Sequence, residues 1–229
     1  MFLRYFAKPA KFDYLHTWLK KPFVKILDVG CGNHSPSRTK KYYPQCKYYG
    51  VDKIRNYNNN AIDFQCMEYF YEADLANSST FDSIPDNFFD CIILSHVIEH
   101  LHKGEEVIVH LLKKLNSSGV IYLEWPSEKS VTLPSMKGTL NFYDDTTHVR
   151  LYQIESLAAL FTEHELSIVA SGTRRSLKRI VLLPLYAIVS LLHEGFLGGH
   201  VFWDIAGFAN YIIAKKSYGM PPSTVIKTG

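Results

Sequence analysis

Short apolar runs alternate with helix-like patterns along most of this 229-residue chain. Each apolar run is short enough for a strand, and most of them end next to an acidic, glycine or proline residue. The runs that predict buried strands are 24–29, 48–51, a part of 67–71, 90–94, 120–125, 166–170 and 210–214. Strands separated by helices favour a parallel sheet that is covered on both faces.

Helical patterns fill several of the gaps between these strands. The pair Ser35-Pro36 is typical of a helix start, with serine at the N-cap and proline at the first position, and Pro44 should end that helix. Residues 105–115 carry acids in the first turn, lysines in the last turn and an apolar stripe at i, i+4 and i+8. Apolar residues at helical spacing in 154–161 predict another amphipathic helix.

The predicted fold class is therefore α/β, with a doubly wound, seven-stranded and mostly parallel sheet in a single domain. We expect an N-terminal helical segment at 1–22, a ligand-binding core at 23–172, and a C-terminal part at 173–229 with an apolar helical insertion and the last strand. The insertion contains 180–192, an apolar stretch interrupted by Pro184 that is too short to span a bilayer. This stretch is predicted to be a buried helix or an interface, with a second copy of the chain or with a membrane surface.

The composition is that of an ordinary folded protein, with 47% hydrophobic and 21% charged residues and a net charge of +3. Such a composition excludes a disordered chain, and so small a charge does not indicate nucleic acid as a partner. The four scattered cysteines form no CxxC pair, and the N-terminus lacks the apolar run of a signal peptide. We therefore expect a reduced, cytoplasmic protein.

Two glycines flank one cysteine directly after the first predicted strand, in the sequence ILDVGCGNHSPS. Without side chains, Gly30 and Gly32 let the backbone approach a ligand closely. Asp52 ends the second strand, where a carboxylate can accept hydrogen bonds from both hydroxyls of a ribose. In a plainer interpretation Gly30 only makes a turn and Asp52 only caps the next helix. Ser35 stands where a nicotinamide-binding G-x-G-x-x-G motif needs its third glycine, which disfavours a dehydrogenase.

The segments LDVGCGNHS, VDK and FDCIILSHVIEHL together resemble the class I S-adenosylmethionine-dependent methyltransferases, in particular those that act on small molecules and glycans. The resemblance extends from Phe23 to Trp125 and more weakly to Gly172. It implies a Rossmann-like sheet and S-adenosylmethionine as the cofactor.

The same resemblance assigns roles to single residues. It implies that Gly30 and Gly32 contact the methionine part of the cofactor, that Asp52 binds the ribose and that Asp74 lies near the adenine. The residues that it places around the cofactor are Asp28, Gly30, Cys31, Gly32, Asp52, Lys53, Asp74, Leu75, Ser95 and His96.

The segment HVIEH, from His96 to His100, also matches the H-x-x-E-H signature of inverted zinc peptidases. On a helix the two histidines would share one face and could bind a metal. The motif directly follows a central strand of a nucleotide-type sheet, however, and no downstream acid is identifiable as a third ligand. We therefore expect no metal.

Methyl transfer to a hydroxyl benefits from a general base, which is often histidine. The predicted catalytic residues are His100, and His148 with Asp145 in the segment NFYDDTTHVRLY. Residues 145–150 follow a D-x-T-H-x-R pattern that resembles methyltransferases encoded with surface-glycan genes. In the alternative interpretation His148 only caps the following helix. The basic segment 173–179, TRRSLKR, faces an anionic group or, as the favoured alternative, solvent.

Together these features predict an enzyme that methylates an oxygen of a small molecule or of a surface-glycan precursor. The competing hypothesis is a protein that binds S-adenosylmethionine without methyl transfer and serves as a partner or scaffold.

Overall fold

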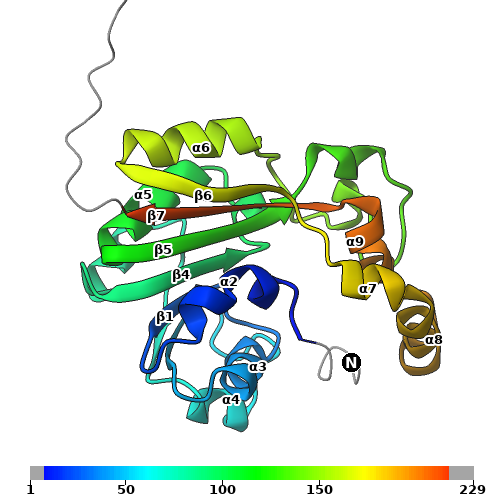
Figure 1. Cartoon of the computed structure of the whole chain (residues 1–229), viewed down its shortest axis with the longest axis horizontal. Coiled ribbons are helices and arrows are strands. Elements are labelled where there is room, and N and C mark those ends of the chain that lie inside the picture. The colour runs from blue at the N-terminus through cyan, green and yellow to red at the C-terminus, as the bar shows by residue number, and fades with distance from the viewer. Residues whose placement is uncertain (1–7, 217–229) are drawn as a thin grey trace, which may run out of the picture.

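The computed structural model describes residues 8–216, which build one sheet with helices on both faces (Figure 1). The strands are β1 (Lys25–Val29), β2 (Lys47–Asp52), β3 (Tyr69–Glu72), β4 (Phe89–Ser95), β5 (Leu115–Pro126), β6 (Leu166–Thr173) and β7 (Ala209–Lys216). Their order in the sheet is β3-β2-β1-β4-β5-β7-β6. Neighbouring strands are parallel except at β7, which runs antiparallel to both β5 and β6. The predicted seven-stranded, mostly parallel sheet is thus confirmed.

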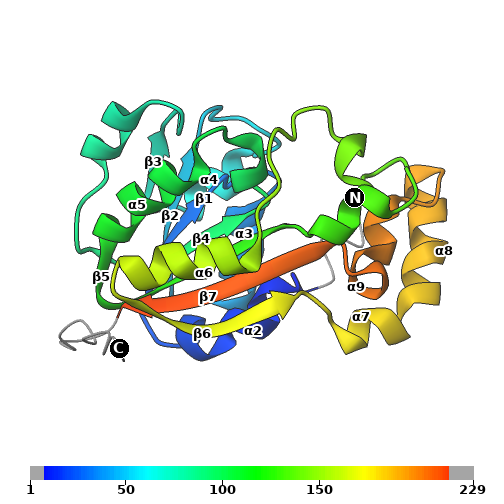
Figure 2. The same cartoon turned by 90° about the horizontal axis from the view of Figure 1, so that it is seen from above.

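The described helices cover the sheet and extend it at one end. They are α2 (Lys11–Leu19), α3 (Ser35–Tyr42), α4 (Ala61–Gln65), α5 (Gly104–Lys114), α6 (Ile154–Glu163), α7 (Leu177–Val181), α8 (Leu183–Glu194) and α9 (Trp203–Ala206). The helices α5 and α6 lie on one face and α2 on the other, while α7, α8 and α9 form an insertion between β6 and β7 (Figures 1 and 2). The division of the chain at residues 22 and 172 stays a prediction.

Each face of the sheet has its own hydrophobic core, because successive strand residues point to opposite faces. Leu27 and Leu123 belong to the core beneath α5 and α6, whereas Ile26 and Tyr122 belong to the core against α2. Burial of each such side chain is worth about 1.5–3 kcal/mol. Since both faces are covered, the central strands are apolar without alternation, which is why unbroken apolar runs located them in the sequence.

The NSSG segment, predicted to be the loop before the fifth strand, is part of β5. The pairing of β5 with β4 shifts register between Phe89 and Cys91, and residues 116–119 fall at this irregularity. The Asn116 side chain donates to Asp90 Oδ1 at 2.5 Å. Residues 116–119 favour a turn by sequence, but pairing with β4 keeps them in the strand.

The helix α3 begins one residue earlier than predicted. His34 is its N-cap, in the left-handed conformation with a φ of 58°, and Ser35 is already helical. The Ser35 hydroxyl donates to Asp28 Oδ2 at 2.5 Å instead of capping the helix. The Ser35 side chain, predicted to cap the helix, thus binds Asp28 instead.

The apolar stretch 180–192 is divided between α7 and α8 and is not buried. Among its residues only Ser190 is buried, while Val181 and Leu192 expose 76% and 78% of their surface. The expectation of a buried helix is wrong, and the expectation of an interface stays a prediction. Within residues 8–216, no helix combines the length and the apolar character that crossing a membrane requires.

Replacing Gly50 of β2 by alanine should destabilise the sheet. A Cβ at this position would lie 2.6 Å from Cys31 Sγ and 3.1 Å from Met67 Sδ, and overpacking of this kind costs about 1–3 kcal/mol. Urea denaturation measures the loss in the free energy of unfolding. In the double variant Gly50→Ala, Cys31→Ala the missing sulfur should recover part of that loss. If the losses of the two single variants simply added in the double variant, the close contact between Gly50 and Cys31 would be contradicted.

Candidate active site

The turn after β1 lies at the carboxyl ends of the parallel strands. Gly30 has a φ of 72°, in the left-handed region, and its amide donates to Val51 O at 2.8 Å. A Cβ on Gly30 would lie 2.5 Å from Val97 Cγ2, and a Cβ on Gly32 would lie 2.6 Å from the Tyr57 ring. Both positions therefore exclude a side chain, because Val97 and Tyr57 already pack against them.

Asp28 connects this turn to two helices. Its buried carboxylate accepts hydrogen bonds from Tyr48 Oη at 2.7 Å, from Ser35 Oγ at 2.5 Å and from Lys11 Nζ at 3.4 Å. Lys11 belongs to α2, and no sequence motif marked it. The contacts hold α2 and α3 against the end of β1 and so determine the shape of the turn.

Asp52 stands opposite the turn, at the end of β2. Its Oδ2 accepts from the amide of Gly32 at 3.1 Å, and its Oδ1 accepts from the amide of Ile54 at 3.3 Å. Burial raises the pKa of Asp52, and the backbone hydrogen bonds act in the opposite direction. No helix begins at Asp52, since α4 starts only at Ala61. A carboxylate has about four acceptor positions, so Asp52 retains capacity for vicinal hydroxyls.

Lys53 and Asp74 form an exposed ion pair at the rim, with 2.7 Å between Lys53 Nζ and Asp74 Oδ2. Asp74 Oδ1 also accepts from the amide of Ala76 at 3.1 Å. The hydrogen bond from Lys53 lowers the pKa of Asp74. Together with Leu75, these residues line the end of the cleft next to β2 and β3.

These groups line one cleft of about 890 Å³. All of the predicted cofactor residues except Cys31 border it, as do His100 and Asp145. The Cys31 thiol is fully buried beside Gly50, and this burial raises its pKa. The Cys31 side chain is therefore a core residue, contrary to the prediction. His148 does not border the cleft directly and lies behind Asp145.

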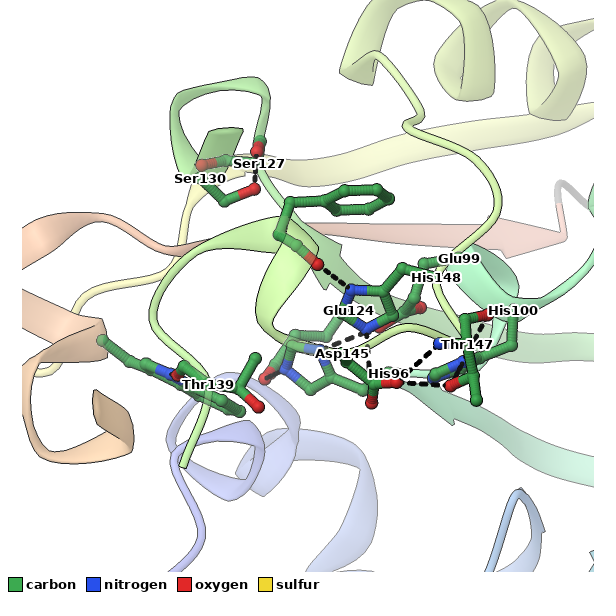
Figure 3. Close-up of polar contacts among 12 residues, drawn as sticks. His96, Glu99, His100, Glu124, Ser127, Ser130, Thr139, Asp145, Thr147 and His148 are labelled. Carbon is green, nitrogen blue, oxygen red and sulfur yellow. Dashed lines mark hydrogen bonds and ion pairs between the residues drawn. The ribbon is translucent and has the colours of Figure 1, made fainter. Parts of the chain in front are cut away.

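A chain of buried charged residues forms one wall of the cleft. His96 donates from Nδ1 to Glu99 Oε1 and from Nε2 to Glu124 Oε1, each at 3.0 Å (Figure 3). Burial acts to lower the pKa of His96, but the two carboxylates raise it to about 9, so the ring is an imidazolium at neutral pH. Arg174 Nη1 lies 3.4 Å from Glu124 Oε1, and Arg174 Nη2 lies 3.5 Å from Asp204 Oδ2.

This arrangement corrects the interpretation of the basic segment 173–179. Arg174 is buried and paired with acids, so the segment is not simply a solvated turn. Trp203, from α9, packs on His96 with 4.8 Å between ring centroids and donates from Nε1 to Thr139 O at 2.6 Å. The insertion between β6 and β7 thereby supplies part of the cleft wall, which no sequence motif indicated.

The loop after β5 is tied to the segment after β4 by its backbone. The amides of Val149 and Arg150 donate to Glu99 O at 2.8 and 3.2 Å. The guanidinium of Arg150 pairs with Glu105 at the start of α5. These contacts bring His148, which lies far away in the sequence, to the cleft end of β4. His148 does not cap α6, whose N-cap is Gln153.

His100 and His148 lie side by side, with 4.8 Å between ring centroids (Figure 3). His148 Nδ1 lies 2.7 Å from Phe142 O, and His148 Nε2 lies 3.9 Å from Asp145 Oδ2. Thr147 donates its hydroxyl to Asp145 Oδ1 at 2.5 Å and lies 2.9 Å from His100 Nδ1. The structure thus brings the three predicted catalytic residues together.

The peptidase interpretation of HVIEH does not fit this geometry. His96 has a φ of 57°, and only Ile98–His100 form a short 3-10 turn, so the two histidines do not share a helix face. Both ring nitrogens of His96 are also occupied by carboxylates. His96 and His100 therefore cannot form the metal-binding pair of that motif.

Comparison with known proteins assigns the larger part of the chain to one family. A family model described as a methyltransferase domain matches residues 3–171. A SAM-dependent methyltransferase from Archaeoglobus fulgidus aligns with a TM-score of 0.58 at 21% identity over 90% of this chain and 92% of that one. A SAM-dependent methyltransferase from Aquifex aeolicus aligns with a TM-score of 0.56 at 11% identity, over 93% and 96% of the two chains.

A further similar structure is the 1,6-didemethyltoxoflavin-N1-methyltransferase of Burkholderia thailandensis with bound S-adenosylhomocysteine. It has a TM-score of 0.58 and 14% identity, over 93% of this chain and 81% of that one. The sequence comparison with curated proteins gives no match.

Replacing Asp144 by asparagine should loosen the loop that carries Asp145 and His148. Asp144 Oδ2 accepts from the amides of Met136, Leu140 and Asn141 at 2.8–3.0 Å. Although burial acts to raise the pKa of Asp144, these bonds lower it to about 2. The ionised carboxylate therefore stabilises the fold above its unfolded pKa, and this stabilisation is lost as the pH falls through about 2.

We expect Asp144→Asn to lower the free energy of unfolding by about 1–2 kcal/mol at pH 7, the scale of a hydrogen bond to a charged group. The difference from the unmodified protein should shrink as the pH is lowered below 4. Urea denaturation at several pH values measures it, with Asp82→Asn reporting the loss of an exposed carboxylate. A constant difference between pH 7 and pH 3 would contradict the assignment.

Proposed function

We propose that this chain, which belongs to the class I S-adenosylmethionine-dependent methyltransferases, transfers the methyl group to a hydroxyl oxygen of a small molecule or of a glycan precursor. The observation that carries the proposal is His100 on the wall of the cleft, with His148 packed against it and Asp145 beside them. Imidazoles held there can accept the proton that a hydroxyl releases on methylation.

The residues present fit the cofactor. Bound S-adenosylmethionine supplies an electrophilic methyl group on sulfur. Gly30 and Gly32 line the cleft, and without side chains their backbone can come close to the cofactor. Asp52 has acceptor capacity for the ribose hydroxyls. We further propose that Asp74 and Leu75 contact the adenine, with Lys53, Asp28, Ser95 and His96 completing the contacts.

With the cofactor bound, methyl transfer would be an in-line displacement, in which the acceptor oxygen would replace sulfur on the methyl carbon. The contribution of the protein is alignment of the two atoms and exclusion of water. The hydroxyl proton passes to a ring nitrogen. His148 Nδ1 faces the carbonyl oxygen of Phe142, which only accepts, so Nδ1 carries the hydrogen and Nε2 is the basic atom in the neutral ring.

Two features support the wider expectations for this protein. All four cysteines are free, and three of them are buried, as expected of a protein from a reducing compartment such as the cytoplasm. The apolar side chains that α7 and α8 leave exposed support the contact expected for 180–192, with a membrane surface or a second copy of the chain.

Replacing Asp52 by alanine should weaken binding of S-adenosylhomocysteine by about 1.5–3 kcal/mol, the scale of a hydrogen bond to a charged group. Isothermal titration calorimetry measures the affinity. Asp52→Asn keeps an oxygen that can accept from the Gly32 amide, so the turn should stay intact in this variant. Its loss of affinity should therefore be smaller and should report the ligand contact alone. Asp82→Ala, an exposed acid outside the cleft, is the control. An unchanged affinity in Asp52→Ala would place the ribose contact elsewhere.

Replacing His148 by asparagine should lower turnover by about 10²–10⁴-fold, the usual contribution of a general base. Affinity for S-adenosylhomocysteine should hardly change, because its expected contacts come from the ends of β1 to β4. His100→Asn is the matched variant. If His148→Asn keeps near-normal turnover while His100→Asn does not, the base is His100. If both variants remain fully active, alignment alone carries the reaction.

The acceptor atom is tested separately. Cofactor labelled with ¹³C in its methyl group, incubated with the protein and fractionated small-molecule extracts, should yield a product whose methyl carbon resonates as a methyl ether. A methyl carbon bonded to nitrogen would overturn the proposal of oxygen methylation.

A further inference from the structure

We propose that Glu99, His100 and His148 bind a divalent transition-metal ion at the acceptor end of the cleft. One ligand atom of each residue lies within 4.8 Å of the other two, close enough to converge on one ion after small side-chain movements. Figure 3 shows the three side chains grouped together, with Asp145 and Thr147 beside them. The site differs from the H-x-x-E-H motif because His96 takes no part in it.

His148 has the hydrogen-bonding pattern of a metal ligand. Its Nδ1 donates to Phe142 O at 2.7 Å, and its ring packs on that of Phe142 with 4.7 Å between centroids. The bond determines the tautomer and leaves the lone pair of Nε2 available. Metal-binding histidines commonly donate their second nitrogen to a backbone carbonyl in this way.

His100 is oriented in the same manner. The Thr147 hydroxyl donates to Asp145 Oδ1, so its oxygen can only accept from His100 Nδ1 at 2.9 Å. The carbonyl oxygen of Thr147, 3.2 Å away, is also an acceptor. Nδ1 of His100 therefore carries the hydrogen, and Nε2 offers a lone pair. Two neighbouring histidines are thus held in the tautomer that metal binding by Nε2 requires.

Glu99 supports the metal site independently of the two histidines. Its side chain is 1% exposed, and Oε1 accepts from His96 Nδ1 at 3.0 Å. Its Oε2 is buried and has no hydrogen-bond partner within the described part of the chain. A buried carboxylate oxygen without a partner is costly. A cation bound between Oε2 and the two histidines would remove that cost.

The donor set indicates the class of metal. Two imidazole nitrogens with one carboxylate oxygen suit first-row transition ions such as Mn²⁺, Co²⁺ or Zn²⁺ better than the all-oxygen preference of Ca²⁺. Three protein ligands leave coordination positions open, as in catalytic metal sites. Asp145, whose side chain is 37% exposed, borders the site from the cleft, with its Oδ2 3.9 Å from His148 Nε2.

What the ion would do follows from its position, and this step rests on the proposed function. An acceptor hydroxyl could occupy an open position on the ion, which would orient the oxygen and lower the pKa of the hydroxyl. Its proton would leave to water of the open cleft. His100 and His148 would then act as ligands rather than as the direct base.

Metal binding can be measured without substrate. Untagged protein is freed of metal by chelation and dialysis, then titrated with Mn²⁺ by calorimetry and by the loss of the free Mn²⁺ electron paramagnetic resonance signal. Co²⁺ is the second probe, because nitrogen ligands change its visible absorption. We expect one ion bound per chain for either metal.

The variants test the ligands individually. His100→Asn and His148→Asn should each abolish stoichiometric binding, and His164→Asn, at the exposed histidine directly after α6, should not. Thr147→Val keeps all three ligands but removes the oxygen that orients His100, and should weaken binding by about 10–100-fold. Circular dichroism and S-adenosylhomocysteine affinity confirm that each variant is folded. His100→Asn remains informative if His148→Asn does not fold.

Absence of saturable binding, or binding that survives the double variant His100→Asn, His148→Asn, would overturn the inference. Oxygen methylation that persists in the unmodified protein after chelation would leave the proposed function intact and overturn the role of the ion in the reaction. Metal binding at these residues together with a nitrogen-methylated product would refute the proposed function and keep the site.

Discussion

A network of buried ion pairs at the cleft end of the sheet positions the loops that carry His100 and His148. Glu99, His96, Glu124 and Arg174 follow one another through ion pairs and come from the ends of β4, β5 and β6. Removing one partner from a buried pair typically costs about 3–5 kcal/mol, because the other charge is left uncompensated. The ends of these strands can therefore not shift independently, and the loops that leave them have defined starting points.

The loop after β5 makes use of this rigid base. Its backbone amides at Val149 and Arg150 bind the carbonyl oxygen of Glu99, whose side chain belongs to the charge network. The position of His148 is thus linked to the end of β4. Within residues 8–216, Oε2 of the same glutamate has no hydrogen-bond partner, and one of its carboxylate oxygens lies within 4.8 Å of a ring nitrogen of His100 and of His148. Network and candidate metal site meet in this residue, so the histidines are placed by buried structure rather than by a free loop.

The insertion between β6 and β7 has two different sides. Toward the cleft, Trp203 of α9 packs on His96, and Asp204 pairs with Arg174. Toward the outside, Leu177 and Leu192 are 79% and 78% exposed. The insertion thus completes the wall of the cleft with α9 and leaves apolar side chains of α7 and α8 exposed on its other side.

Sequence was sufficient for the features that depend on local pattern. Strands buried on both faces are unbroken apolar runs, so their positions were predictable, with errors only where contacts override local preference, as for Ser35 and for residues 116–119. Gly30, Gly32 and Asp52 could be predicted to lie together because carboxyl ends of parallel strands meet on one side of a sheet, and all three line the cleft.

Contacts between distant segments were decided by the tertiary structure alone. Lys11 reaches Asp28 because α2 packs across β1, and Arg174, at the end of β6, reaches Glu124 of β5 across the intervening strand β7. The peptidase motif required a downstream acid as third ligand beside His96 and His100, whereas the fold brings His148 next to Glu99 and His100. Sequence spacing encodes which side chains share one strand or helix face. Which faces meet depends on packing and backbone hydrogen bonds across the whole chain, as between Val149 and Glu99.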